Sequence, residues 1–463
     1  MTLAASFLLA SPGLASGSQA TASSQVEVAA PQETLASKID ALVAARAKRP
    51  TFSGLSVAVA QRGEVVFEKA YGLADEEFSV AADTATMFRI GSVTKQYTAA
   101  LVLRFVERGK LSLDDTLDKF VPQFPLHTSP AGRVVTVRQL LNHTSGIPSY
   151  TDLGEEWSAK WPLELSHEEL LALVAGKPFD FEPGASWRYN NTGYYLLGMV
   201  LEKVSGKSYA KLVQEEIAKP LGLSRTRYDS NEELLKNRAQ GYTLKGRNKV
   251  NDVPLGMNQP GAAGGLVSTA GELVRWKVAL RGGKVVSPES FALMTTPVAA
   301  ADGTGGDYGF GLMVDEFEGR RRIQHGGGIF GFNSMLMWFP EADVAVAVIS
   351  NCEPESSSDI ADDVALAALG IQRAPVLDLA LTAELAQELA GEYRIAQLGL
   401  DVAITARDGK LFARATGQGE FRLKFQGERS FRADFDDSVR LEFAADGRSF
   451  TLHQGGGQFV AKR

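Results

Sequence analysis

The chain has 463 residues, of which 44% are hydrophobic and 22% are charged. That length predicts two or three domains, and the composition excludes a disordered chain, a collagen and a disulfide scaffold. The formal charge of −7 argues against a dedicated nucleic-acid binder, because phosphate contacts need a basic surface. The single cysteine, Cys352, excludes an intrachain disulfide and a multi-thiolate metal site, and we expect it to be buried.

The first residues resemble an export signal. Residues 3–10 are apolar and are followed by Pro12, Gly13 and Ala15, which is typical of a secretory signal and its cleavage zone. No Lys or Arg precedes Lys38, so an apolar tail is the alternative. We predict a signal peptide and flexible spacer over residues 1–32, and a periplasmic or secreted protein. No apolar run reaches the ~20 residues that cross a bilayer.

A large domain is predicted over residues 33–370. Helical spacing marks residues 33–46, 92–108 and 357–369, and strand-like runs cover 54–60, 64–71, 321–325, 332–339 and 344–349. Helices dominate the middle of this domain. Strands at both ends therefore favour one antiparallel sheet that both ends build and that helices cover, an α+β fold.

A second, all-β domain is predicted over residues 385–463, after a linker at 371–384. About eight short alternating runs follow one another, which is typical of a small up-and-down barrel or sandwich. The runs are residues 392–396, 400–406, 410–415, 421–425, 430–435, 439–444, 449–453 and 459–461. We find no nucleophile or metal cluster in this domain.

Three familiar motifs are misleading or missing. Gly326-x-Gly328-x-x-Gly331 fits a dinucleotide-binding pattern, but a strand and not a helix is expected after it. His167-Glu168 starts like a zinc-protease helix, but the second His is missing, and a solvated helix start is favoured. The G-x-S-x-G elbow of α/β-hydrolases is absent.

Ser92 and Lys95 form an S-x-x-K motif, which places a hydroxyl beside an amine on one helix face. A buried lysine can lose its proton and activate a serine as a nucleophile. The Ser92 N–H, at the start of its helix, is a candidate oxyanion donor. A second S-x-x-K, Ser208 to Lys211, lies on an amphipathic helix with the lysine expected in water.

Two further elements supply matching chemistry. Tyr189 can pass a proton to a leaving group, and Asn191 can hold a substrate carbonyl and orient the lysine. His325 is followed by Gly326, Gly327 and Gly328, and such bare backbone lets a substrate lie along a strand. The Gly328 N–H is the candidate second oxyanion donor, and His325 supplies a polar or cationic edge.

These elements, in this order, resemble the penicillin-recognising serine hydrolases, which include class C β-lactamases, D-alanyl-D-alanine carboxypeptidases, D-aminopeptidases and esterases. The resemblance covers about residues 34–370 and includes segments 88–98, 140–148, 181–198 and 261–269. It implies a β-lactamase/transpeptidase-like fold, an antiparallel sheet flanked by helices with a helical lobe, followed by a small lipocalin-like barrel that has residues 389–393 near its start.

The resemblance also implies roles for the residues singled out. Ser92 would be the nucleophile, Lys95 and Tyr189 the proton-transfer pair, and Asn191 a substrate contact. His325, Gly326 and Gly327 stand where class C β-lactamases carry Lys-Thr-Gly. Because a neutral histidine binds a carboxylate poorly, acyl-enzyme chemistry is expected more than antibiotic hydrolysis.

The sequence therefore predicts a serine hydrolase for short peptides or amides, D-residues included, or for small esters. The alternatives are a true β-lactamase and a penicillin-binding or interaction protein without turnover. We expect a small-molecule or short-peptide substrate, no nucleic acid, no membrane span, no metal and no cofactor.

Overall fold

The computed structural model describes residues 34–463, apart from residues 50, 127, 247, 354–356, 373–375, 436–438, 455 and 456. The predicted signal peptide and spacer, residues 1–32, lie outside the described residues. Within the described part of the chain, no helix is long and apolar enough to cross a membrane.

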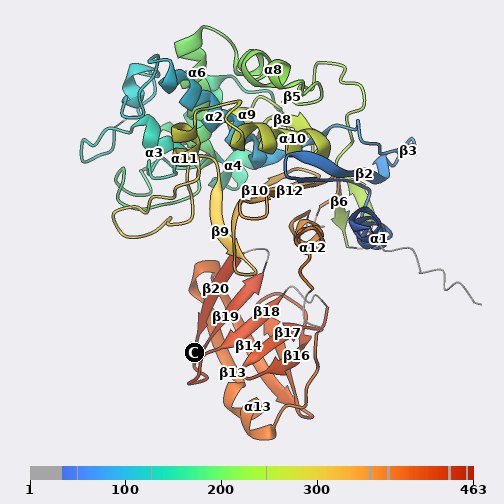
Figure 1. Ribbon diagram of the computed structural model, residues 1–463. Coiled ribbons are helices and arrows are strands. Elements are labelled where there is room, and N and C mark those ends of the chain that lie inside the picture. Colours follow the sequence, from blue (N-terminus) through green and yellow to red (C-terminus); the bar gives the residue numbers. More distant parts are fainter. Residues whose placement is uncertain are drawn as a thin grey trace, which may run out of the picture. The chain divides into compact units, whose positions relative to one another are not determined.

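A seven-stranded antiparallel sheet organises the large domain, with the strand order β3-β2-β1-β12-β11-β10-β9 (Figure 1). The N-terminal strand β1 lies beside the C-terminal strand β12, with Val57 opposite Val348. This confirms the single sheet built from both ends. Its strands are β1 (Gly54–Gln61), β2 (Glu64–Asp75), β3 (Val80–Ala81), β9 (Met313–Phe317), β10 (Arg320–Ile329), β11 (Phe332–Phe339) and β12 (Val344–Ser350).

The two faces of the sheet pack against different helices. The valines of β1 and β12 face the helices α1 (Leu35–Ala47) and α12 (Ser357–Leu369). These are the first and last helices of the domain, and they contact each other. Alternate positions such as Ala58 point to the other face, toward α10 (Ala270–Arg281). Because alanine is small, α10 can lie close to the strands on that face.

A helical lobe carries the rest of the domain. Its centre is formed by α2 (Thr94–Glu107), α6 (Asn191–Ser205) and the short α9 (Gly261–Gly264), which contact one another. A Cβ on Gly198 of α6 would lie 2.7 Å from the Cβ of Ala262, so this glycine allows α6 and α9 to meet. The other helices are α3 (Val137–Leu141), α4 (Glu155–Ser158), α5 (His167–Ala175), α7 (Tyr209–Leu212), α8 (Lys219–Leu221) and α11 (Pro288–Met294).

The small strands of this domain form two further sheets, β4-β8-β5 and β6-β7. Their bounds are β4 (Phe88–Arg89), β5 (Arg227–Tyr228), β6 (Tyr242–Lys245), β7 (Asn248–Asn251) and β8 (Leu266–Ser268). Strand β4 leads directly into the segment that contains Ser92.

The C-terminal residues form a closed barrel of eight antiparallel strands, which confirms the predicted all-β architecture. Helix α13 (Ala383–Leu389) precedes it, and Tyr393, Phe431 and Phe450 are among the buried residues that fill it. The exact domain boundaries stay predictions. The strands are β13 (Gly391–Ile395), β14 (Leu400–Arg407), β15 (Lys410–Ala415), β16 (Phe421–Gly427), β17 (Ser430–Ala433), β18 (Arg440–Phe443), β19 (Ser449–Gln454) and β20 (Gly457–Lys462).

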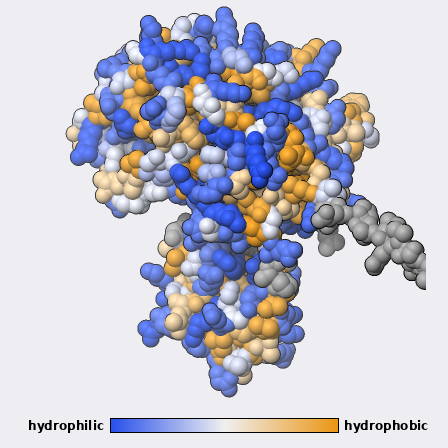
Figure 2. All heavy atoms as spheres, viewed as in Figure 1, coloured by the Kyte–Doolittle hydropathy of each residue, from blue (hydrophilic) through white to orange (hydrophobic). Residues whose placement is uncertain are grey.

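The surface mixes polar and apolar side chains. Figure 2 shows hydrophilic side chains over most of the visible face, with smaller hydrophobic areas between them. Phe78 and Leu234 are 80% and 97% exposed. Exposed apolar residues at single positions are normal for a folded protein and do not mark a functional site.

Candidate active site

Ser92 lies in a 3₁₀ turn (Gly91–Val93) that leads into α2, so the α-helix itself begins two residues later than Ser92. Gly91 has a φ of +47°, and a Cβ there would lie 2.8 Å from the Gly328 carbonyl oxygen. Only glycine combines this backbone conformation with so close a neighbour. The turn therefore brings Ser92 beside the glycine-rich part of β10.

Lys95 connects Ser92 to two other segments. Its Nζ lies 3.1 Å from Ser92 Oγ, 2.8 Å from Asn191 Oδ1 and 2.9 Å from the Ala263 carbonyl oxygen. The amide and carbonyl oxygens can only accept, so two N–H groups of Lys95 point at them. In the neutral amine, the lone pair is then left facing Ser92 Oγ, which is the position of a general base.

The surroundings of Lys95 favour that neutral form. The side chain is fully buried, and burial lowers the pKa of Lys95 well below its usual value. Among the described residues, no carboxylate forms an ion pair with it. Its Nζ instead lies 4.7 Å from the ring centre of Tyr189 and 5.5 Å from that of Tyr194.

Asn191, the first residue of α6, is held so that its oxygen faces Lys95. Its Nδ2 donates to Thr151 Oγ1 at 3.0 Å, and its backbone N–H donates to Ser149 Oγ at 3.2 Å. The preceding Asn190 caps α6 by accepting from the Gly193 N–H. The sequence pattern Tyr-Asn-Asn thus combines a helix cap with a residue of the site.

Tyr189 presents a protonated phenol to the same centre. Burial raises the pKa of Tyr189, and the nearby Ser92 hydroxyl offsets this only in part. Within the described part of the chain, the buried Tyr189 hydroxyl has no hydrogen-bond partner. Its O–H is therefore available as a donor to a substrate rather than as a resident base.

His325 is neutral, so of the two expected forms it supplies a polar edge and not a cationic one. It is 3% exposed, with Nδ1 2.6 Å from the Gly326 carbonyl oxygen and Nε2 2.9 Å from the Tyr308 hydroxyl. The carbonyl oxygen only accepts, so Nδ1 carries the proton and Nε2 accepts from Tyr308. Burial is the main cause that lowers the pKa of His325 to about 3.

The three glycines after His325 have different surroundings. A Cβ on Gly327 would overlap the Ile90 carbonyl oxygen and Ser334 Oγ, whereas a Cβ on Gly328 would meet no atom within 4 Å. Gly328 lines the pocket beside Ser92, while Gly326 and Gly327 are not among the lining residues. These glycines belong to strand β10, so the dinucleotide-binding motif was rightly rejected.

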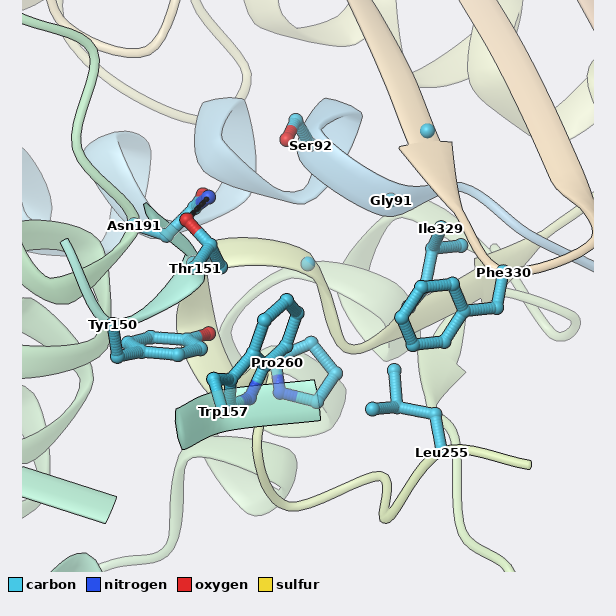
Figure 3. A pocket seen from close by; sticks show the side chains of 13 residues that line it. Gly91, Ser92, Tyr150, Thr151, Trp157, Asn191, Leu255, Pro260, Ile329 and Phe330 are labelled. Atoms are coloured by element: carbon cyan, nitrogen blue, oxygen red, sulfur yellow. Dashed lines mark hydrogen bonds between the residues drawn. The ribbon is translucent and has the colours of Figure 1, made fainter. Parts of the chain in front are cut away.

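The pocket beside Ser92 has a volume of about 120 Å³. In Figure 3, Ser92 and Asn191 lie above Trp157, Phe330 and Leu255, which form the opposite wall. None of the residues that line this pocket carries a charge. They are Gly91, Ser92, Tyr150, Thr151, Trp157, Asn191, Leu255, Pro260, Ala263, Gly264, Gly328, Ile329 and Phe330.

The aromatic wall is held from behind by one buried residue. Gln259 accepts from the Tyr150 hydroxyl through its carbonyl oxygen and from Trp157 Nε1 through Oε1, both at 2.8 Å. The rings of Trp157 and Phe330 are stacked, with centres 6.2 Å apart. The wall is thus a preorganised apolar surface.

The second S-x-x-K has the structural role that was expected of it. Ser208 caps α7 by accepting from the Lys211 N–H, and the Lys211 side chain is 58% exposed. His167 is the first residue of α5, after the capping box of Ser166 and Glu169, which confirms the helix start.

Sequence reasoning missed the residues that complete the site. Lys95 is bound by the backbone carbonyl of Ala263, and a backbone group leaves no residue type to recognise, although segment 261–269 resembles the family. Thr151 lies in a 3₁₀ turn, Trp157 in the short α4 and Phe330 in the turn between β10 and β11, and none of these segments has a clear local pattern. Tyr308, the partner of His325, is far from any motif.

A fully buried lysine between a serine and an asparagine, with a phenol above it, defines the class of serine hydrolases that activate their nucleophile with lysine. The beta-lactamase family model matches residues 39–370, and the chain belongs to this family.

Three similar proteins match a large part of the chain. Penicillin-binding protein 4* of Bacillus subtilis (strain 168) is 27% identical over 444 residues, which cover 89% of this chain and 95% of the relative. The octameric penicillin-binding protein homologue from Pyrococcus abyssi has a TM-score of 0.67 and 27% identity, covering 92% of this chain and 99% of that one. A D-stereospecific amidohydrolase from Streptomyces sp. has a TM-score of 0.60 and 28% identity, and the match covers 73% of this chain and 98% of the amidohydrolase.

Proposed function

We propose that this serine hydrolase cleaves short amides and peptides, or small esters, whose acyl part carries an apolar or aromatic group and no free carboxylate. The observation that carries the proposal is the uncharged aromatic pocket beside Ser92. An apolar wall of this kind gains from burying a ring, and it offers no cation to a carboxylate.

The reaction proceeds in two steps. Lys95 takes the proton of Ser92 as Oγ bonds to the carbonyl carbon, and the N–H groups of Ser92 and Gly328 face the developing oxyanion. The Tyr189 hydroxyl gives its proton to the leaving nitrogen or oxygen and regains one from Lys95. Water then attacks the acyl-enzyme, gives up a proton to the restored base, and Ser92 leaves as the free alcohol.

The charge of the site disfavours the β-lactamase alternative. A β-lactam carries a carboxylate, and binding it needs a fixed cation. Lys95 is fully buried and His325 is neutral, so neither supplies one. The D-stereospecific amidohydrolase among the similar structures supports substrates with a D-residue as the first choice.

A substrate panel with the Ser92→Ala variant tests the proposal. We expect turnover of D-phenylalanyl-p-nitroanilide and p-nitrophenyl acetate, faster on the aromatic amide than on D-alanyl-p-nitroanilide, with little nitrocefin hydrolysis. A fluorophosphonate probe should label the wild type at Ser92, and Ser92→Ala should remove labelling and all turnover.

The alternatives give different results. Fast nitrocefin turnover would identify a β-lactamase. Covalent labelling by penicillin without turnover of any substrate would identify a binding protein. Undiminished labelling of Ser92→Ala would overturn the assignment of the nucleophile.

A further inference from the structure

His143 is a buried histidine beside the site that the mechanism does not use. It is 1% exposed and lies just after α3, in the left-handed backbone region with a φ of +62°. A non-glycine residue in that region is strained unless its surroundings hold it there. Its contacts therefore merit a functional explanation.

His143 holds the backbone on both sides of Tyr189. Its carbonyl oxygen accepts from the Arg188 N–H at 3.1 Å. Its Nδ1 accepts from the Asn190 N–H, also at 3.1 Å. The N–H groups of the two residues that flank Tyr189 are thus bound to a single residue, which restricts the direction of the Tyr189 side chain.

The imidazole also packs against the Tyr189 ring. The centres of these two rings are 4.5 Å apart, and the Tyr308 ring lies at the same distance on another side of His143. Tyr308 is in turn bound to His325. The Tyr189 ring therefore rests on a continuous buried layer that ends at strand β10.

The protonation state of His143 follows from these bonds. Because Nδ1 accepts a hydrogen bond from the Asn190 N–H, the ring proton sits on Nε2, and this buried nitrogen has no hydrogen-bond partner among the described residues. Burial is the main cause that lowers the pKa of His143 well below its usual value. A charged, proton-shuttling role is therefore excluded for this residue.

A buried N–H without a hydrogen-bond partner lowers the stability of the folded protein, so stability alone does not explain why a histidine occupies this position. A phenylalanine would remove this N–H but would leave the Asn190 N–H without an acceptor. The imidazole is the side chain that supplies both a flat ring under Tyr189 and an acceptor for the next peptide group.

We propose that His143 is a positioning residue for Tyr189, holding its hydroxyl beside Ser92 for proton transfer to the leaving group. The proposal rests on the function proposed above. It implies that His143 matters most where the leaving group needs a proton. Amines leave only when protonated, whereas p-nitrophenolate leaves as an anion.

The test compares an anilide and a p-nitrophenyl ester of the same acyl group in His143→Phe, which keeps a ring and loses the acceptor. We expect kcat on the anilide to fall about 10- to 100-fold, with a much smaller loss on the ester and a nearly unchanged KM. His143→Asn, which restores an acceptor near the Nδ1 position, should recover part of the anilide activity.

A double-mutant cycle identifies the residue through which His143 acts. In a Tyr189→Phe background, His143→Phe should cause no further loss on the anilide. Additive losses, or equal losses on both substrates, would overturn the proposal. If His143→Phe does not fold, the same cycle with His143→Asn decides the question.

Two controls distinguish a positioning role of His143 from a general loss of structure and from failure of the proposed function. His167→Phe replaces a half-exposed histidine that binds Tyr195, and it should leave the anilide-to-ester ratio unchanged. Fluorophosphonate labelling of Ser92 in His143→Phe shows that the fold and the nucleophile persist. Absence of labelling in the wild type would instead contradict the proposed function itself.

Discussion

Two buried lysines show that a low pKa alone does not make a catalytic base. Lys95 faces Ser92, Asn191 and the Ala263 carbonyl. Lys277 on α10 is equally buried, and its Nζ binds Gln96 Oε1 at 3.0 Å. Burial lowers the pKa of Lys277 to about 7, but no hydroxyl nucleophile binds its amine. What distinguishes Lys95 as the candidate base is therefore its contact with the Ser92 hydroxyl, not its burial.

Lys277 should make stability depend on pH. Its pKa is about 7 in the folded chain against an ordinary value of 10.5, so the unfolded chain binds more protons between these values. The free energy of unfolding should then rise with pH in that window, by up to about 1.4 kcal/mol per pH unit. The penalty is complete below about pH 7 and absent above the unfolded pKa.

Urea unfolding of Lys277→Met across this window measures the effect. The variant should be more stable than the wild type near neutral pH, and the difference should shrink as pH rises. Lys211→Met, at a lysine side chain that is 58% exposed, is the matched control and should show no such trend. Parallel pH profiles for wild type and Lys277→Met would contradict the expectation.

At the level of elements, the site depends on how closely β10 approaches the turn before α2. Ser334 Oγ on β11 donates to the Ile90 carbonyl oxygen at 2.8 Å. Gly327 lies against the same carbonyl. The strand can therefore deliver the Gly328 N–H to the site only if residue 327 has no side chain.

The two neighbouring glycines give a matched pair of variants. Gly327→Ala should destabilise the protein by about 1–3 kcal/mol or more, because an added methyl must displace backbone. Gly328→Ala adds the same methyl where no atom lies within 4 Å, so it should melt like the wild type and change only substrate fit. Equal melting temperatures for both variants would disprove this account of the close approach.

At the level of the whole molecule, the described hydrophobic residues fall into separate clusters. Two clusters cover the two faces of the seven-stranded sheet, and the third is confined to α13 and the barrel. Since the third cluster is built only from residues after the hydrolase domain, we expect the barrel and the hydrolase domain to unfold as separate cooperative units.

Calorimetry of the full chain should resolve two transitions. Phe431→Ala, at a fully buried barrel position, should lower the melting temperature of only one transition. The free energy of unfolding of the barrel should fall by about 3–5 kcal/mol, and the rate of Ser92 labelling should stay unchanged. Val346→Ala, in the sheet core, should lower the melting temperature of the other transition. A single transition that both variants shift would show that the two parts fold as one unit.

Much of this fold was predictable because its signals are local. The alternation of residues 344–349 and the helical spacing of residues 357–369 correspond to β12 and α12 almost residue for residue. The pairing of β1 with β12 was favoured only by economy, since strands nearly three hundred residues apart leave no mark on each other's periodicity.

The sequence by itself determined the main strands of the large sheet, the helices at the two ends of that domain, the order of the motifs and the residue types needed for acyl transfer, because these depend on spacing along the chain. The tertiary structure decided which S-x-x-K holds a buried lysine, that His325 is neutral, and that an uncharged aromatic wall faces Ser92. Burial and proximity set pKa values and pocket chemistry, and both arise only when distant segments pack together.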